Sequence, residues 1–196
     1  MTGTHRPPRP KALLDAIEAE VPVALSGPVW RVVAAGRDPL CAARSGGRWD
    51  DGTFDVLYTS KEREGAIAEA WFHATKGQPV IPSKVSRGLY RLQVNLERVL
   101  DLSGGGKLAR LGVAMATFGR MSYVQRVQEY PTPQQIAEIA FFHEYQALIV
   151  PNARWPTHNV VVLTEHVRPG QVVVAEAEGE PVDLAAWGAS ARMDRR

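Results

Sequence analysis

Apolar residues recur along this chain with two different periods, and these periods predict an alternation of helices and strands. A period near 3.6 residues is typical of a helix with one apolar face. In ALLDAIEAEV it places Leu13, Leu14, Ile17 and Val21 on that face, before Pro22 ends the segment. The same period predicts further helices over KEREGAIAEAWFHATKG (61–77), KLARLGVAMATF (107–118) and PTPQQIAEIAFFHEY (131–145).

Segments rich in β-branched and aromatic residues predict the strands. They are VWRVVAA (29–35), FDVLYTS (54–60), RGLYRLQVNLERVLDL (87–102), QALIVPNAR (146–154), NVVVLTEH (159–166) and PGQVVVAEAEG (169–179). NVVVLTEH is predicted to be a central strand because its first part is entirely apolar, whereas PGQVVVAEAEG is predicted to be an edge strand. Helices and strands are interspersed without a regular βαβ rhythm, which predicts an α+β fold with a mixed, largely antiparallel sheet and flanking helices.

The length of 196 residues suits one domain with a substantial core. Residues 1–10 hold three prolines and two arginines and are predicted to form a disordered tail. Residues 11–187 are predicted to form the single domain. The charged segment 188–196 is predicted to be a frayed C-terminal tail.

Composition excludes several classes of protein. No apolar run approaches the ~18 residues of a membrane helix, and no secretory signal is visible, so we expect no membrane association. A single cysteine, Cys41, excludes a disulfide framework and fits the reducing cytoplasm. We expect Cys41 to be a small buried residue, with a nucleophile as the less favoured alternative. A net charge of only +2 gives no bulk electrostatic argument for direct nucleic-acid binding.

Candidate chemistry is concentrated in residues 45–73, where Arg48, Tyr58 and Glu69 occur on three consecutive elements. The guanidinium of Arg48 suits a pyrophosphate or a carboxylate. The Tyr58 ring offers a stacking surface, and the Glu69 carboxylate can accept hydrogen bonds from a ribose diol and oppose positive charge at its anomeric carbon. The residues alone also allow a structural reading, in which Arg48 and Glu69 form an ion pair and Tyr58 belongs to the core.

Arg31 adds a cation inside an otherwise apolar strand, where an unpaired charge is costly to bury. We therefore expect it to meet an anion, either a protein carboxylate or a ligand. Metal sites are not expected, because no pair of histidines has HxxxH or HExxH spacing. No serine lies in a GxSxG elbow, so a nucleophilic triad is also poorly supported.

GGRWDDG, LYTS, AIAEAWFH and LIVPNARWPTHNVVVL occur in the order and spacing of the RES domain family. The chain therefore resembles the toxins of RES–Xre toxin–antitoxin pairs, over roughly residues 29–163. The resemblance implies a fold similar to that of ADP-ribosyltransferases. It also implies an enzyme that degrades NAD+ at the nicotinamide–ribose bond, by hydrolysis as a glycohydrolase or by phosphorolysis as a phosphorylase.

Carried over by motif, the resemblance implies an NAD+ site formed by Arg31, Arg48, Tyr58, Glu69 and Asn152. The arginines would bind the diphosphate, Tyr58 would stack on nicotinamide, and Glu69 would stabilise the ribose cation. Glu69, Tyr58 and Arg48 would be the catalytic residues.

Three positions depart from the family pattern, one of them where the family commonly has glycine and this chain has Gln146 or Ala147. Asn152 stands where the family usually has serine. Asp50 stands where it commonly has asparagine, adding a negative charge that needs a cation such as Arg44 or Arg48 beside it.

The resemblance further implies a helix-turn-helix antitoxin of the Xre type as partner, and a homodimer. NAD+ would be the substrate, with inorganic phosphate as co-substrate in the phosphorolytic case and no bound cofactor. One alternative is an ADP-ribosyltransferase acting on a macromolecular acceptor. Another is a catalytically inactive relative that binds NAD+ or protein.

Overall fold

The computed structural model describes residues 9–75, 86–104, 106–120, 126–176 and 178–193. Most of the predicted N-terminal tail and the last three residues lie outside these ranges. The helices are α1 Lys11–Glu18, α2 Arg63–Thr75, α3 Lys107–Arg110, α4 Arg126–Glu129, α5 Pro131–Phe142, the 3₁₀ helix Thr164–His166 and α6 Leu184–Met193. The strands are β1 Val23–Ala34, β2 Val56–Ser60, β3 Arg87–Asp101, β4 Ala147–Pro151, β5 His158–Leu163, β6 Val172–Val174 and β7 Glu180–Val182.

The strands form one sheet in the order β1-β2-β5-β4-β3-β6, and β1 also pairs with β3, so the path returns on itself. Among the described strands, only β3 and β4 pair in parallel; the other pairs are antiparallel. The predicted α+β fold with a mixed, largely antiparallel sheet is therefore confirmed. β5 lies between β2 and β4 and β6 lies at an edge, as their sequences predict.

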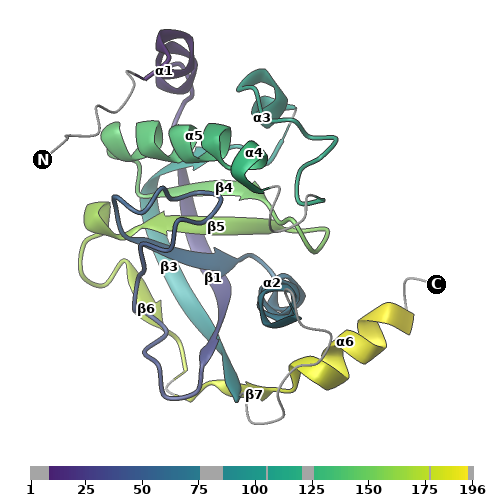
Figure 1. The fold of residues 1–196 in the computed structure, drawn as a ribbon. Coiled ribbons are helices and arrows are strands. Elements are labelled where there is room, and N and C mark those ends of the chain that lie inside the picture. Colours follow the sequence, from purple (N-terminus) through teal and green to yellow (C-terminus); the bar gives the residue numbers. More distant parts are fainter. Residues whose placement is uncertain (1–8, 76–85, 105, 121–125, 177, 194–196) are drawn as a thin grey trace, which may run out of the picture.

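The central strands β4 and β5 are buried on both faces. Alternate side chains such as Val160 and Val162 face a core formed with β1 and β3. The intervening Val161 and Leu163 face a second core with α1 and α5. Figure 1 shows α5 lying along β4 and β5 with α1 beyond it, while α2 and α6 lie near the opposite end of β1. This two-faced burial explains the continuous apolar sequence of β5.

Several local predictions are wrong. The expected helix over 107–118 ends at Arg110, because Gly112 adopts a positive φ of 85° that an α-helix does not accommodate. Val21 follows α1 instead of lying on its apolar face, and its side chain is exposed. Cys41, expected to be buried, is exposed in the loop after β1.

The C-terminal segment also differs from expectation, since 188–193 continue helix α6 instead of fraying. Asp183 caps this helix, its carboxylate accepting hydrogen bonds from the N–H groups of Ala185 and Ala186 at 2.9 Å. Trp187 then packs against Trp71 of α2, with ring centroids 6.2 Å apart. The tryptophan contact and the cap hold a helix that charge and composition did not predict.

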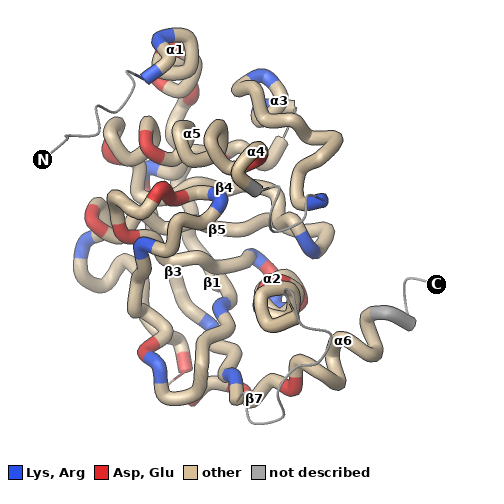
Figure 2. The backbone as a smooth tube through the Cα atoms, in the orientation of Figure 1, with Lys and Arg blue, Asp and Glu red and all other residues tan. Residues whose placement is uncertain are grey.

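Lys and Arg residues are interspersed with Asp and Glu residues along the backbone (Figure 2). Such a mixture matches the small net charge and offers no continuous basic stripe for a nucleic acid along the described chain. None of the described helices has the length and apolar character required to cross a membrane.

Candidate functional site

A cavity of about 290 Å³ opens where β1 and β2 meet α2. One register pair, Trp30 with Ser60, joins β1 to β2. Beyond this pair β1 continues along β3 and β2 along β5, so the two strands diverge. Helix α2 follows β2 directly and covers the space between them. Most of the predicted site residues line the cavity, namely Arg31, Arg48, Tyr58 and Glu69.

Arg31 enters the cavity from β1 as a cation that forms no ion pair with any residue that the structure describes. Its Nη2 donates to the carbonyl of Cys41 at 2.9 Å, whereas its buried Nη1 has no hydrogen-bond partner in the described part of the chain. No carboxylate within the described ranges forms an ion pair with it. Burial, and then the positive charge of Arg37, lower the pKa of Arg31 to about 10. Of the two anions considered for Arg31, this geometry favours a ligand.

Arg48 is paired, but with a residue that the sequence did not indicate. Its Nε donates to Glu129 Oε1 at 2.9 Å, and both side chains are nearly buried, at 12% and 6% exposed. The guanidinium also lies over the rings of Phe118, 4.7 Å from the centroid, and Tyr130, at 5.5 Å. The ion pair between Arg48 and Glu69 considered from sequence is therefore wrong.

Asp50 organises the turn that carries Arg48. Its fully buried carboxyl group accepts hydrogen bonds from the N–H of Gly46 at 2.7 Å and of Gly47 at 2.9 Å. The hydroxyl of Tyr58 donates to the same group at 2.9 Å and accepts from the N–H of Trp49 at 3.0 Å. The departure from the family pattern at Asp50 is thus compensated by backbone and phenol donors instead of by Arg44 or Arg48.

The Tyr58 hydroxyl is fully engaged, which limits what it can do. Burial, followed by the negative charge of Asp50, raises the pKa of Tyr58 well above its ordinary value. The phenol therefore stays protonated at neutral pH and is no base or nucleophile, while its ring remains on the cavity wall. A side chain at Gly47 would come within 2.6 Å of the Tyr58 hydroxyl, so glycine is required there.

Replacing Asp50 by alanine should therefore destabilise the protein. Asp50→Ala leaves several buried donors without an acceptor, and we expect the free energy of unfolding to fall by about 3 kcal/mol. Urea denaturation monitored by tryptophan fluorescence measures this change. Asp38→Ala is the matched control, because Asp38 accepts one exposed hydrogen bond from the N–H of Leu40, and its loss should cost under ~1 kcal/mol. Equal losses for the two variants would contradict the role assigned to Asp50.

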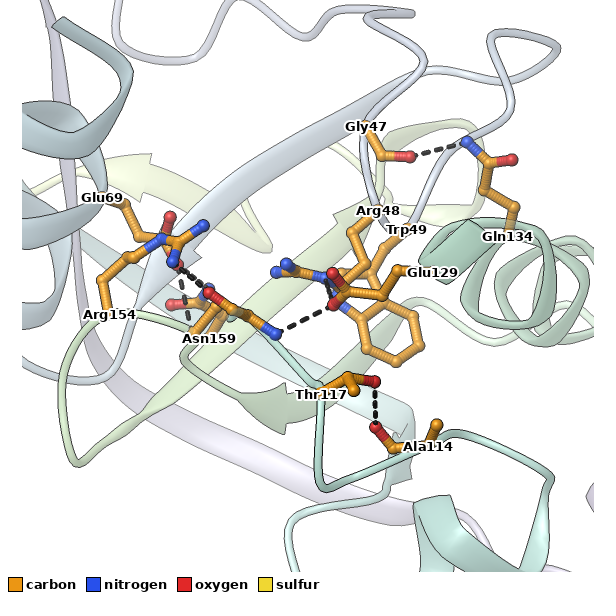
Figure 3. Close-up of polar contacts among 12 residues, drawn as sticks. Gly47, Arg48, Trp49, Glu69, Ala114, Thr117, Glu129, Gln134, Arg154 and Asn159 are labelled. Atoms are coloured by element: carbon orange, nitrogen blue, oxygen red, sulfur yellow. Dashed lines mark hydrogen bonds and ion pairs between the residues drawn. The ribbon is translucent and has the colours of Figure 1, made fainter. Parts of the chain in front are cut away.

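Glu69 reaches the cavity from α2 and is held from the opposite wall. Its Oε1 accepts from the N–H of Ala153 at 3.3 Å and from Nδ2 of Asn159 at 3.5 Å. Figure 3 shows Glu69, Asn159 and Arg154 together on one side of the site, with Arg48 and Glu129 on the other. Glu69 is thus fixed relative to the turn between β4 and β5.

Asn152 shapes that turn instead of lining the cavity. Its Oδ1 accepts from the N–H of Arg154 at 2.7 Å and of Trp155 at 3.0 Å. Its Nδ2 donates to the carbonyl of Gly65 at 3.2 Å and to Oδ1 of Asn159 at 2.8 Å. The sequence predicted contact with NAD+, but the structure positions Asn152 behind the wall, where it orients the residues that face the cavity.

Arg154 is a cavity residue that sequence reasoning missed. Its guanidinium lies 3.3 Å from the centroid of the Phe72 ring. Burial lowers the pKa of Arg154, and the nearby Glu69 carboxylate opposes this shift. The sequence did offer a signal for Arg154: it is an arginine two residues after Asn152, in a turn already assigned to the site.

The rest of the wall is largely aromatic, from Trp30, Tyr58, Phe72 and Tyr130. Within the described ranges, no group of three or more His, Cys, Asp or Glu residues could hold a metal ion. The cavity therefore offers cations for an anion, flat rings for stacking, and one carboxylate for a developing positive charge.

Comparisons with known proteins agree with this architecture. The sequence profile of the RES domain matches residues 26–185. Among solved structures, the MbcT–MbcA toxin–antitoxin complex of M. tuberculosis contains a similar chain. That chain superposes with a TM-score of 0.74 at 20% identity, covering 93% of this chain and 98% of its own. Such a likeness shows a shared fold. No curated protein matches the chain.

Proposed function

The chain belongs to the RES domain family, and from this premise we propose that it is a toxin-like enzyme that degrades NAD+ by cleaving the nicotinamide–ribose bond. One observation carries the proposal: Arg31, a half-buried arginine whose Nη1 has no hydrogen-bond partner among the described residues, lines the same aromatic cavity as the carboxylate of Glu69. A dinucleotide brings a diphosphate for the cation and a ribose for the carboxylate. The cavity lies at the small end of the range for ligand sites, so the dinucleotide would extend beyond it.

The reaction is dissociative. The bond between C1′ of the ribose and the nicotinamide nitrogen breaks, and its electron pair neutralises the pyridinium nitrogen. Positive charge moves to the ribose, where Glu69 opposes it. Water or inorganic phosphate then forms the new bond to C1′; attack by water releases a proton to solvent.

Arg31 and Arg48 hold the diphosphate in this mechanism, and Tyr58 presents its ring to the nicotinamide. Tyr58 acts by stacking alone, since its hydroxyl is bonded to Asp50 and to the backbone of Trp49. Asn152 contributes indirectly, by fixing the turn whose Ala153 N–H binds Glu69.

The partner is an antitoxin of the helix-turn-helix, Xre type, which neutralises the enzyme. The similar solved structure is a complex of a toxin with its antitoxin. We extend that arrangement to this chain because the two share the fold over most of their lengths.

The test is incubation of the purified protein with NAD+, with and without inorganic phosphate. We expect nicotinamide to be released. Formation of ADP-ribose in both buffers would indicate hydrolysis, and a phosphorylated ADP-ribose formed only with phosphate would indicate phosphorolysis. Label from NAD+ appearing on a protein or nucleic acid would favour the transferase alternative. Absence of both turnover and NAD+ binding in calorimetry would overturn the proposal.

A further inference from the structure

Both backbone polar groups of Gly119 are bonded to charged side chains of the site. Its N–H donates to Glu129 Oε1 at 2.9 Å, the same oxygen that pairs with Nε of Arg48. Its carbonyl accepts a hydrogen bond from Nη1 of Arg154. Arg48 and Arg154, which come from different walls of the cavity, are thereby connected through one residue; Figure 3 shows the two arginines and Glu129.

Only glycine satisfies the steric conditions at position 119. Its φ of 71° is in the left-handed region, which costs other residues roughly 1–2 kcal/mol. A Cβ atom there would come within 2.7 Å of the Ala153 Cβ and 2.9 Å of the Ala153 carbonyl oxygen. Because the N–H of Ala153 binds Glu69, Gly119 also presses against the turn that holds the carboxylate.

The segment leading to Gly119 has its own anchors. Thr117 closes a local turn, with its Oγ1 donating to the carbonyl of Ala114 at 3.1 Å and its carbonyl accepting from the N–H of Arg120 at 2.9 Å. Val113 is buried in the core, and Phe118 packs against the same core beneath the guanidinium of Arg48. These contacts therefore fix the position of Gly119 at the end of the segment.

We propose that Gly119 is a positioning residue that fixes Arg48 and Arg154 relative to each other, so that the two arginines receive one diphosphate-bearing ligand as a unit. This inference rests on the proposed function for the identity of the ligand. Arg154 thereby becomes an anion-binding residue alongside Arg31 and Arg48. Movement of either arginine is transmitted to the other through a residue that itself touches no ligand.

Binding of inorganic pyrophosphate, measured by calorimetry, tests this connection without turnover. We expect Gly119→Ala to weaken binding about tenfold, the effect of losing one well-placed charged hydrogen bond. Gly112→Ala is the matched control: it lies in the same segment with φ of 85°, but its Cβ would meet nothing closer than 3.8 Å. Affinity should stay within about twofold of the original for that variant.

A double-mutant comparison then separates positioning from general damage. The penalty of Gly119→Ala should shrink at least threefold, roughly 0.65 kcal/mol, in an Arg154→Ala background. It should persist in an Arg31→Ala background, because Arg31 is bonded to Cys41 and not to Gly119. A penalty unchanged in both backgrounds would overturn the inference.

Glu129→Gln tests independently whether this network positions Arg48 for anion binding. The variant remains informative even if Gly119→Ala does not fold. Removing a negative charge near an anion site strengthens binding by electrostatics alone. Loss of the ion pair that holds Arg48 instead weakens it, and we expect weaker pyrophosphate binding. Tighter binding, or no pyrophosphate binding by the original protein, would overturn the positioning role. Pyrophosphate binding that behaves as expected, without nicotinamide release from NAD+, would instead refute the proposed function.

Discussion

Glu69→Gln should abolish most nicotinamide release while leaving substrate binding and the fold nearly unchanged. Glutamine keeps the size of glutamate and an oxygen that can accept from the N–H of Ala153 and from Asn159. It lacks the charge that opposes the ribose cation, and loss of one such electrostatic group typically costs about 10²–10³-fold in kcat. Because the cation exists only near the transition state, KM should change little.

Steady-state release of nicotinamide measures the effect, with circular dichroism as a check on folding. Glu62→Gln is the matched control, since Glu62 is exposed just before α2 and lies outside the cavity. Its kcat should equal that of the original protein. Full activity of Glu69→Gln would remove Glu69 from the mechanism.

Arg31→Met should have two opposite effects: the free energy of unfolding should rise, and the affinity for the ligand should fall. A partly buried cation that forms no ion pair within the described residues destabilises the folded state, and a pKa lowered from the ordinary value of arginine to about 10 corresponds to roughly 3 kcal/mol. Methionine fills similar space without charge, so we expect the free energy of unfolding at pH 8 to rise by about 1–3 kcal/mol. The Cys41 carbonyl lies in an exposed loop, where water can replace the lost donor.

The pH dependence of this penalty has a definite sign. Between about pH 10 and the higher pKa of a free arginine, the unfolded chain keeps the Arg31 proton and the folded chain releases it. The penalty is therefore complete below about pH 10 and is relieved as the pH rises above that value. At pH 8 the full gain from Arg31→Met should appear in urea denaturation.

Affinity for ADP-ribose should fall in the same variant by about 10–100-fold, the worth of charge-assisted hydrogen bonds to a phosphate. Arg91→Met is the control, because Arg91 stands opposite Trp30 on β3 with its side chain 44% exposed. Neither its stability nor its affinity should change by more than about 0.5 kcal/mol. If Arg31→Met lost stability and kept its affinity, Arg31 would be structural.

The sequence predicted the elements whose patterns are governed by burial. β5 is apolar over residues 160–163 because both of its faces are covered there, and α5 repeats apolar residues where it packs on the sheet. Prediction from the sequence failed where a local backbone condition decides where a helix begins or ends. Gly112 ends the expected helix over 107–118, and Asp183 caps a helix that continues through 188–193, where composition predicted a frayed tail.

The sequence predicted the candidate site in part, as it did the fold. Arg31, Arg48, Tyr58 and Glu69 meet at one cavity because motifs on consecutive elements are brought together by a short strand and its following helix. Glu129, which pairs with Arg48, was missed, because its contact depends on how a distant segment folds back. Asn152 was assigned a ligand contact, although its amide is consumed by the turn around it.

The single register pair between β1 and β2 has a consequence for the local stability of the site. β1 is bound to β3 along nearly its whole length, and β2 is bound to β5, but in the described structure Trp30 and Ser60 form the one register pair between β1 and β2. Separation here breaks few backbone hydrogen bonds and leaves both halves paired. The cavity thus lies where two strands of one sheet part after a single register pair, so we expect local opening between β1 and β2 to disassemble the site while each strand keeps its other partner.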